Sequence, residues 1–227
     1  MSVWSRGTGG GRRCGGSRRR VAVLPVVLSA VVLSAAGCQR PEPGSVSGER
    51  QTASAQWRDL SMLLGAGELG SNWREGDARV GLPPWPWEQS TCPHYRSDDY
   101  PARSYRQGAV ERFYHPSDGS SPAHHVVEKF EPGWAERDVE DVRRVLARCA
   151  SYRMLGSHVS FSIVDSRYRA GTGLLIRGGI EHAASPPTVT YFVVLRRGEM
   201  VSTFSLPDPG SRAVLDSIAA RVEARLG

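Results

Sequence analysis

Serines, histidines and acidic residues, the types that together could hydrolyse a bond, occur in the second half of the chain. His158, Asp165 and one of the many serines could be drawn as a catalytic triad, in which the histidine activates a hydroxyl nucleophile. Nothing in the sequence fixes their geometry, and the motifs GxSxG and HExxH, the phosphate-binding P-loop and the dinucleotide-binding fingerprint are all missing. The sequence therefore predicts no catalytic residue and a non-enzymatic protein.

Two adjacent pairs of residues could in principle ligate a metal. His124 and His125 fall on a predicted strand, where successive side chains point to opposite faces, so the two cannot share one ion. Asp98 and Asp99 fall in a predicted loop, but a calcium site needs six or more oxygen ligands. We therefore predict neither a metal site nor a cofactor.

Aromatic residues gather in the stretch GLPPWPWEQSTCPHY, residues 81–95. Its prolines forbid a regular helix and predict a loop. Trp85, Trp87 and Tyr95 give this loop an aromatic surface that could stack on a ligand. The alternative is that the three rings seal the open end of a helix–sheet core.

The N-terminal region has the pattern of an export signal. Six arginines precede Val21, an apolar run follows to Ala36, and small residues lead to Cys38. The end of this pattern resembles the bacterial lipobox, although the family prefers Leu where this chain has Ala35. The resemblance implies cleavage before Cys38 and a diacylglyceryl lipid (palmitate) on its thiol. The alternatives are an uncleaved anchor or a plain secretory signal, with Cys38 incidental.

The stretch SRRRVAVL, residues 17–24, also resembles a twin-arginine export signal, with Arg18 and Arg19 as the pair. An ordinary basic region is the alternative. We therefore expect a signal peptide over residues 1–37, of the lipoprotein type and with either export route open. Residues 38–55 are polar and rich in Pro, Gly and Ser, which predicts a flexible tether. A folded domain is expected over residues 56–227.

The net charge of +6 belongs to the N-terminal region. The 29 basic and 23 acidic residues differ by six, and six arginines precede Val21, where no acidic residue occurs. The rest of the chain is formally neutral, which argues against nucleic acid as a partner.

The exported context bears on the remaining cysteines. Cys14 falls in the expected signal and Cys38 at the expected lipid site, which leaves Cys92 and Cys149. An even pair in an exported protein predicts a disulfide. A metal site with the nearby His94 is the alternative, but the usual CxxC or HxxxH partners are missing.

The periodicity of the domain predicts hairpins and two long helices. Alternating apolar residues predict strands over residues 107–115, 123–131, 158–166 and 171–179 and a hairpin over 187–206, whereas a helical period covers 133–149 and 207–227. Grouped hairpins with few helices are typical of the α+β class. We expect an antiparallel sheet of about six strands, two main helices packed on one face, and one disulfide.

The element order, the helix ending in Cys149, the hairpin sequence VLRRGEMVSTFSL and the closing helix resemble the PknH-like extracellular sensor domain. That domain occurs on actinobacterial receptor kinases and on stand-alone lipoproteins. The opening LLGAGELGSNW is also similar, and the resemblance covers Leu60 to Gly227. It implies a compact α+β domain with a cleft for an extracellular ligand. The receptor-kinase version has two disulfides, whereas this chain can form one, and no kinase domain is present, which implies a separate membrane signalling protein as partner.

These observations predict an actinobacterial lipoprotein anchored through Cys38 to the outer face of the plasma membrane. Its domain would bind or sense an unidentified extracellular ligand, with Trp85, Trp87 and Tyr95 as the candidate contact residues. A cell-envelope hydrolase and a protein–protein interaction module are the alternatives.

Overall fold

The computed structural model describes residues 57–169, 171–182 and 185–227. The described residues belong to one compact unit. The expected signal peptide, the lipid site Cys38 and the tether up to residue 55 lie outside the described residues.

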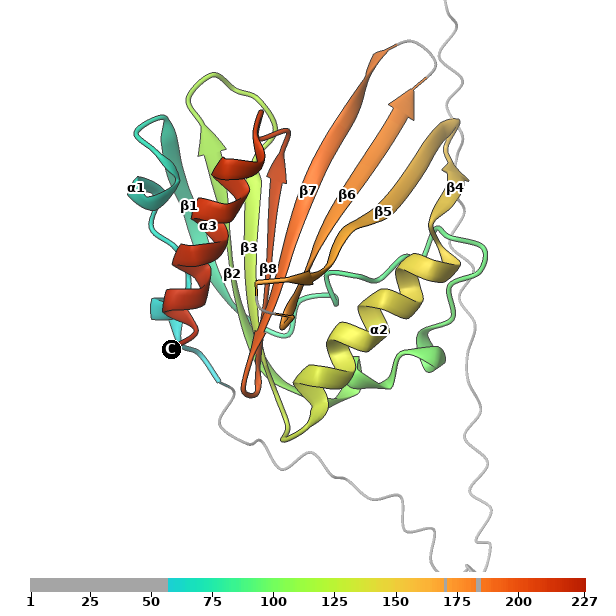
Figure 1. The fold of residues 1–227 in the computed structure, drawn as a ribbon, viewed down its shortest axis with the longest axis horizontal. Coiled ribbons are helices and arrows are strands. Elements are labelled where there is room, and N and C mark those ends of the chain that lie inside the picture. The colour runs from blue at the N-terminus through green and yellow to red at the C-terminus, as the bar shows by residue number, and fades with distance from the viewer. Residues whose placement is uncertain (1–56, 170, 183–184) are drawn as a thin grey trace, which may run out of the picture. The chain divides into compact units, whose positions relative to one another are not determined.

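The described part of the chain forms a single antiparallel sheet of eight strands in the order β1-β2-β3-β8-β7-β6-β5-β4 (Figure 1). The strands are β1 (Trp73–Gly81), β2 (Arg106–Pro116), β3 (Ala123–Phe130), β4 (Ser151–Met154), β5 (Ser157–Tyr168), β6 (Gly173–His182), β7 (Ser185–Arg197) and β8 (Met200–Pro207). The helices are α1 (Ala66–Leu69), α2 (Trp134–Arg148) and α3 (Arg212–Arg225), and short 3-10 turns occupy Leu60–Met62, Ser97–Asp99 and Pro101–Tyr105.

The expectation of about six strands was wrong, because the two edge strands were missed. β1 is largely exposed and pairs with β2 through a register irregularity between Glu75 and Ala78, so its sequence is polar and lacks a strict alternation. β4 has only four residues and follows directly after α2 and its terminal Cys149. Neither strand buries enough apolar side chains to produce a period-2 signal.

The two long helices cover opposite faces of the sheet, which corrects the expectation that both pack on one face. The core cluster that contains α3 includes Leu175 and Val193, whereas the cluster that contains α2 includes Leu174, Ile176 and Val194. Since neighbouring residues of a strand point to opposite faces, these consecutive buried residues require cover on both sides. The two faces are called here the α2 face and the α3 face.

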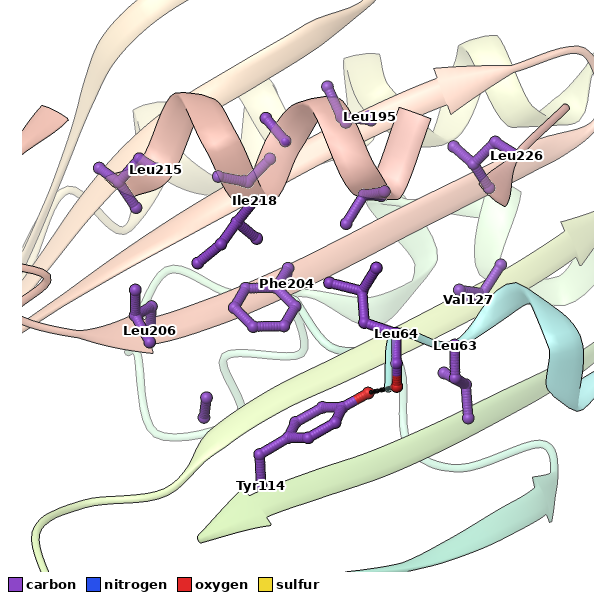
Figure 2. Packing of buried hydrophobic residues seen from close by; sticks show 14 of the residues in the cluster. Leu63, Leu64, Tyr114, Val127, Leu195, Phe204, Leu206, Leu215, Ile218 and Leu226 are labelled. Atoms are coloured by element: carbon purple, nitrogen blue, oxygen red, sulfur yellow. Dashed lines mark hydrogen bonds between the residues drawn. The ribbon is translucent and has the colours of Figure 1, made fainter. Parts of the chain in front are cut away.

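The α3 face is closed by helix α3 and by the segment that opens the domain. Figure 2 shows Leu215 and Ile218 of α3, and Leu226 just after the helix, above the strands, with Phe204 of β8 beneath them. From the opening segment, the carbonyl oxygen of Leu64 accepts a 2.7 Å hydrogen bond from the hydroxyl of Tyr114 (Figure 2). This face is a packed core.

The α2 face is covered only in part. Helix α2 packs through Val139, Val142 and Val145 against the central strands, and it ends at the disulfide between Cys92 and Cys149, whose Cα atoms lie 6.0 Å apart. The expected disulfide is therefore present. The loop from residue 82 to residue 105 covers a second part of this face, and the surface beyond the C-terminal end of α2 is left without a helix.

Candidate ligand-binding site

An apolar cavity of about 160 Å³ lies on the α2 face, over strands β4 to β7. We call it the apolar groove. No residue of α2 lines it, although the helix packs against other parts of β5, β6 and β7. The lining side chains share an apolar or hydroxyl character: Tyr152, Met154, Val159, Phe161, Ile180, Thr188, Thr190 and Phe192, over the backbone of Gly178 and Gly179.

Strand register places these residues on one face. Val159 is paired with Ile180, Phe161 with Gly178, and Gly178 with Thr190. A Cβ atom at Gly178 would lie 3.0 Å from the ring of Phe192 and 3.2 Å from the ring of Phe161. Glycine at this position therefore lets two aromatic rings, with centroids 6.3 Å apart, line the same groove.

The disulfide packs behind one wall of the groove. Cys92 and Cys149 are buried in a small cluster with Tyr152 and Val159, against which Met154, Phe161 and Ile180 pack. The hydroxyl of Tyr152 donates a 2.7 Å hydrogen bond to Oε1 of Gln89. Gln89 belongs to the loop over residues 81–95, which we call the aromatic loop. The disulfide and this hydrogen bond hold the loop beside the groove.

Trp85 and Trp87 are almost completely buried, with 2% and 1% of their surface exposed. Nε1 of Trp85 donates to Oδ1 of Asp138 at 2.9 Å, and Nε1 of Trp87 donates to the hydroxyl of Thr203 at 3.3 Å. The ring of Trp87 lies 5.2 Å from that of Phe192. In the structure the two indoles therefore close the core between loop and sheet, which is the alternative that the sequence left open.

Tyr95 is half-buried, and its ring stacks on that of Tyr100 with centroids 5.1 Å apart. Burial raises the pKa of its hydroxyl. Tyr95 packs against the disulfide cluster but does not line the apolar groove. Trp87 and Tyr95 thus pack behind the groove, and Tyr152, Phe161 and Phe192 supply its aromatic surface.

A second cavity of about 370 Å³ lies on the same face, between the aromatic loop and strands β1, β2, β3 and β8. We call it the polar cavity. Its charged residues are Arg79, Glu111 and His124, and Trp85 and Phe192 also line it. Nε2 of His124 lies 3.0 Å from Oε2 of Glu111, and the guanidinium of Arg79 lies 3.8 Å from Oε1 of Glu111. Burial lowers the pKa of His124, although Glu111 opposes this shift.

Two buried carboxyl groups lie beneath the aromatic loop. Asp138 of α2 is fully buried, and burial, followed by the charge of Glu128, raises its pKa well above the usual value. Glu128 of β3 forms a 2.7 Å ion pair with Arg106, and burial raises its pKa as well. Asp138 is therefore harder to ionise in the folded domain than in water.

The residues considered for catalysis are not brought together as the sequence suggested. Asp165 pairs with Arg212 of α3 at 3.3 Å and not with His158. His158 instead lies 2.7 Å from the hydroxyl of Ser151, and its Nδ1 lies 3.5 Å from Glu181. This Ser-His-Glu chain lies on the exposed face of the edge strands opposite the apolar groove, since His158 and Glu181 alternate with Val159 and Ile180. No cavity described above is lined by any of the three.

The residues considered for metal binding are also apart. His124 lies in the polar cavity, whereas His125 is buried on the α3 face, 2.8 Å from the hydroxyl of Ser202, where burial lowers its pKa to about 3. Asp99 pairs with Arg148, and His94 is exposed. Among the described residues, no group of three or more His, Cys, Asp or Glu side chains could hold a metal ion.

The groove residues were missed from the sequence. Two adjacent glycines inside a predicted strand, Gly178 and Gly179, mark a site where another group approaches the backbone closely. The strand containing Phe161 was also predicted, but the sequence alone did not show that β4 would join it or that α2 would leave this part of the sheet uncovered.

Comparison with known proteins supports the fold. No family model matches the chain, and no curated protein matches it. Among solved structures, the extracellular domain of PknH from Mycobacterium tuberculosis is similar, with a TM-score of 0.51 and 13% sequence identity. The similar region covers 72% of this chain and 94% of that structure. No helix among the described residues is long and apolar enough to cross a membrane. The structural similarity shows that the described domain has the fold of the extracellular domain of PknH.

Proposed function

We propose that this domain is a non-enzymatic binding domain that holds the apolar part of an extracellular ligand in the apolar groove. The observation that carries the proposal is an open cavity lined by Phe161, Ile180 and Phe192 on a part of the α2 face that no helix covers. Ligand sites are typically concave, mostly apolar and preformed. The disulfide and the loop beside the groove hold its wall in place without a ligand.

We further propose that the chain is a lipoprotein on the outer face of the plasma membrane, with a lipid on Cys38. The pattern of arginines, apolar run and small residues before Cys38 supports this. The likeness to an extracellular domain and the disulfide, which is stable in oxidising compartments, agree with export. A binding domain on a lipid tether would pass its signal to a separate membrane protein.

Binding in the apolar groove can be tested with a fluorescent acyl probe, 11-(dansylamino)undecanoic acid, and residues 49–227, which contain both core clusters. Its emission should increase and shift to the blue on binding. Thr190 is the cross-strand partner of Gly178, so in Thr190→Phe a ring would fill the groove. We expect this variant to weaken binding by roughly tenfold or more.

The matched control is Val189→Phe, which adds a ring at the neighbouring position of β7 on the opposite face. It should bind the probe as the unchanged domain does. If Thr190→Phe keeps its melting temperature and binds the probe with unchanged affinity, the apolar groove is not the binding site.

A further inference from the structure

The polar cavity is the neighbour of the apolar groove on the α2 face. Phe192 lines both cavities. Register places His124 of β3 opposite Ser205 of β8, and Ser205 opposite Phe192 of β7. With neighbouring strands about 4.8 Å apart, His124 lies roughly 10 Å from Phe192 across the sheet. One small molecule could therefore reach from the apolar groove past Phe192 into the polar cavity.

The charges of the polar cavity balance. The side chain of Glu111 is 11% exposed and is paired with Arg79, which is 71% exposed and lies at the mouth of the cavity. His124, with 26% of its side chain exposed, has a lowered pKa and is neutral above that pKa, so it donates its Nε2 proton to Glu111. In that tautomer Nδ1 is an acceptor, and the described residues form no hydrogen bond with it.

The cavity therefore offers both acceptors and donors without net charge. Glu111 and His124 provide acceptors, Arg79 provides donors, and the ring of Phe113 stacks on His124 with centroids 4.0 Å apart. An anionic group would be repelled by Glu111, and a cationic group would be repelled by Arg79. A neutral group with several hydroxyls can donate to the first and accept from the second.

We infer that the ligand is amphipathic, with its apolar part in the apolar groove and a neutral, hydroxyl-bearing head group, such as a glycosyl group, in the polar cavity. This inference rests on the proposed function, because the head group is placed by the apolar part beside it. Glu111 is the residue that selects the head group, and Arg79 contributes at the cavity mouth.

Four octyl compounds that differ only in the head group can test this by calorimetry below their micelle concentrations: octyl β-D-glucoside, octanol, octanoate and octyltrimethylammonium. The glucoside should bind residues 49–227 most tightly. Glu111→Gln should weaken glucoside binding by roughly five- to tenfold and leave octanol unchanged. Arg79→Gln, at an exposed side chain where folding is not at risk, should weaken it less.

Glu136→Gln, at an exposed position of α2, is the control and should bind all four compounds as the unchanged domain does. If none of the four binds, the proposed function itself fails. If all four bind equally, or if Glu111→Gln keeps its melting temperature and still prefers the glucoside, the apolar groove stands and the head-group inference is overturned. A preference for octyltrimethylammonium or octanoate would also overturn it.

Discussion

The indole Nε1 of Trp85 donates a 2.9 Å hydrogen bond to Oδ1 of Asp138, and both side chains are buried. This bond ties the aromatic loop to helix α2. Its acceptor belongs to an acid whose pKa is raised well above the usual value by burial and by the nearby charge of Glu128. The attachment of the loop is therefore linked to proton binding.

The stability of the domain should fall as pH rises through the raised pKa of Asp138. Unfolding returns Asp138 to its usual pKa, so the folded state binds more protons in the window between the two values. The stabilising effect of the proton is complete below the unfolded pKa and is lost as pH rises through the folded one. Asp138→Asn keeps an oxygen for Trp85 and replaces the acid proton by an amide donor. It should raise the melting temperature at pH 7 by a few degrees and change it little at pH 4.

The measurement is thermal unfolding from pH 4 to pH 8, followed by circular dichroism. Asp138→Ala, which removes the acceptor of the Trp85 bond, should be destabilised at every pH. An Asp138→Asn variant that loses stability with the same pH slope as the unchanged domain would contradict the assignment of the proton to Asp138.

Removal of the disulfide should cost the domain stability and weaken the probe binding. Cys92 and Cys149 are separated by 57 residues, and closing a loop of this size contributes about 4 kcal/mol in the chain-entropy model. The double variant Cys92→Ala, Cys149→Ala should show this loss in urea unfolding. It should also loosen the loop that packs behind the groove and weaken binding of the acyl probe. Reducing agent should reproduce both effects in the unchanged domain and neither in the variant.

Gly178→Ala should narrow the apolar groove, because its Cβ would lie 3.0 to 3.2 Å from two aromatic rings. We expect a loss of about 1–2 kcal/mol of stability from overpacking and a weaker affinity for the acyl probe. Gly179→Ala is the matched control, since its Cβ would approach only the hydroxyl of Ser160, which can rotate away. Equal effects of the two variants on probe binding would argue against a groove over Gly178.

Cys38→Ser should release the exported chain from the membrane fraction. Each methylene of a lipid chain contributes roughly 0.8 kcal/mol to membrane binding when it is buried in the bilayer. A serine at position 38 would carry no such chain. The measurement is fractionation of cells that express the full chain, with metabolic labelling by an alkyne analogue of palmitate. Cys14→Ser is the control and should keep both label and membrane association. Label that persists in Cys38→Ser would contradict lipidation at Cys38.

Ser151 should not react with a fluorophosphonate that labels serine hydrolases. Its hydroxyl lies 2.7 Å from Nε2 of His158, but the pair lies on an open strand surface away from the cavities described above. Ser151→Ala should therefore bind the acyl probe normally. Labelling that the change to alanine abolishes would favour the hydrolase alternative.

The sequence predicted the central elements because they bury apolar side chains with a regular period. The hairpin β7–β8 forms as the pattern indicated, with its turn at Gly198 and Glu199, and α2 ends at Arg148 with Cys149 as its C-cap. The strand β1 was missed because its exposed residues are polar. The prediction that both helices pack on one face was wrong because the apolar side of a helix does not show which face of the sheet it packs against.

The site was harder to predict than the core. Indoles in a proline-rich loop have the same pattern whether they contact a ligand or fill the core, and only the hydrogen bonds of Trp85 and Trp87 distinguish the two. Glu111 and His124 lie on different strands, and their contact depends on the pairing of β2 with β3. Such pairs become visible only when the register is known.

The central strands present consecutive buried residues, such as Leu174, Leu175 and Ile176, to two separate interiors. We expect a substitution on one face of the sheet to change the packing of the other face little. If the apolar groove binds the ligand as proposed, the residues beneath α3 should vary less among homologues than the residues that line the groove. The sheet would then separate the residues that maintain the fold from the residues that determine which ligand is bound.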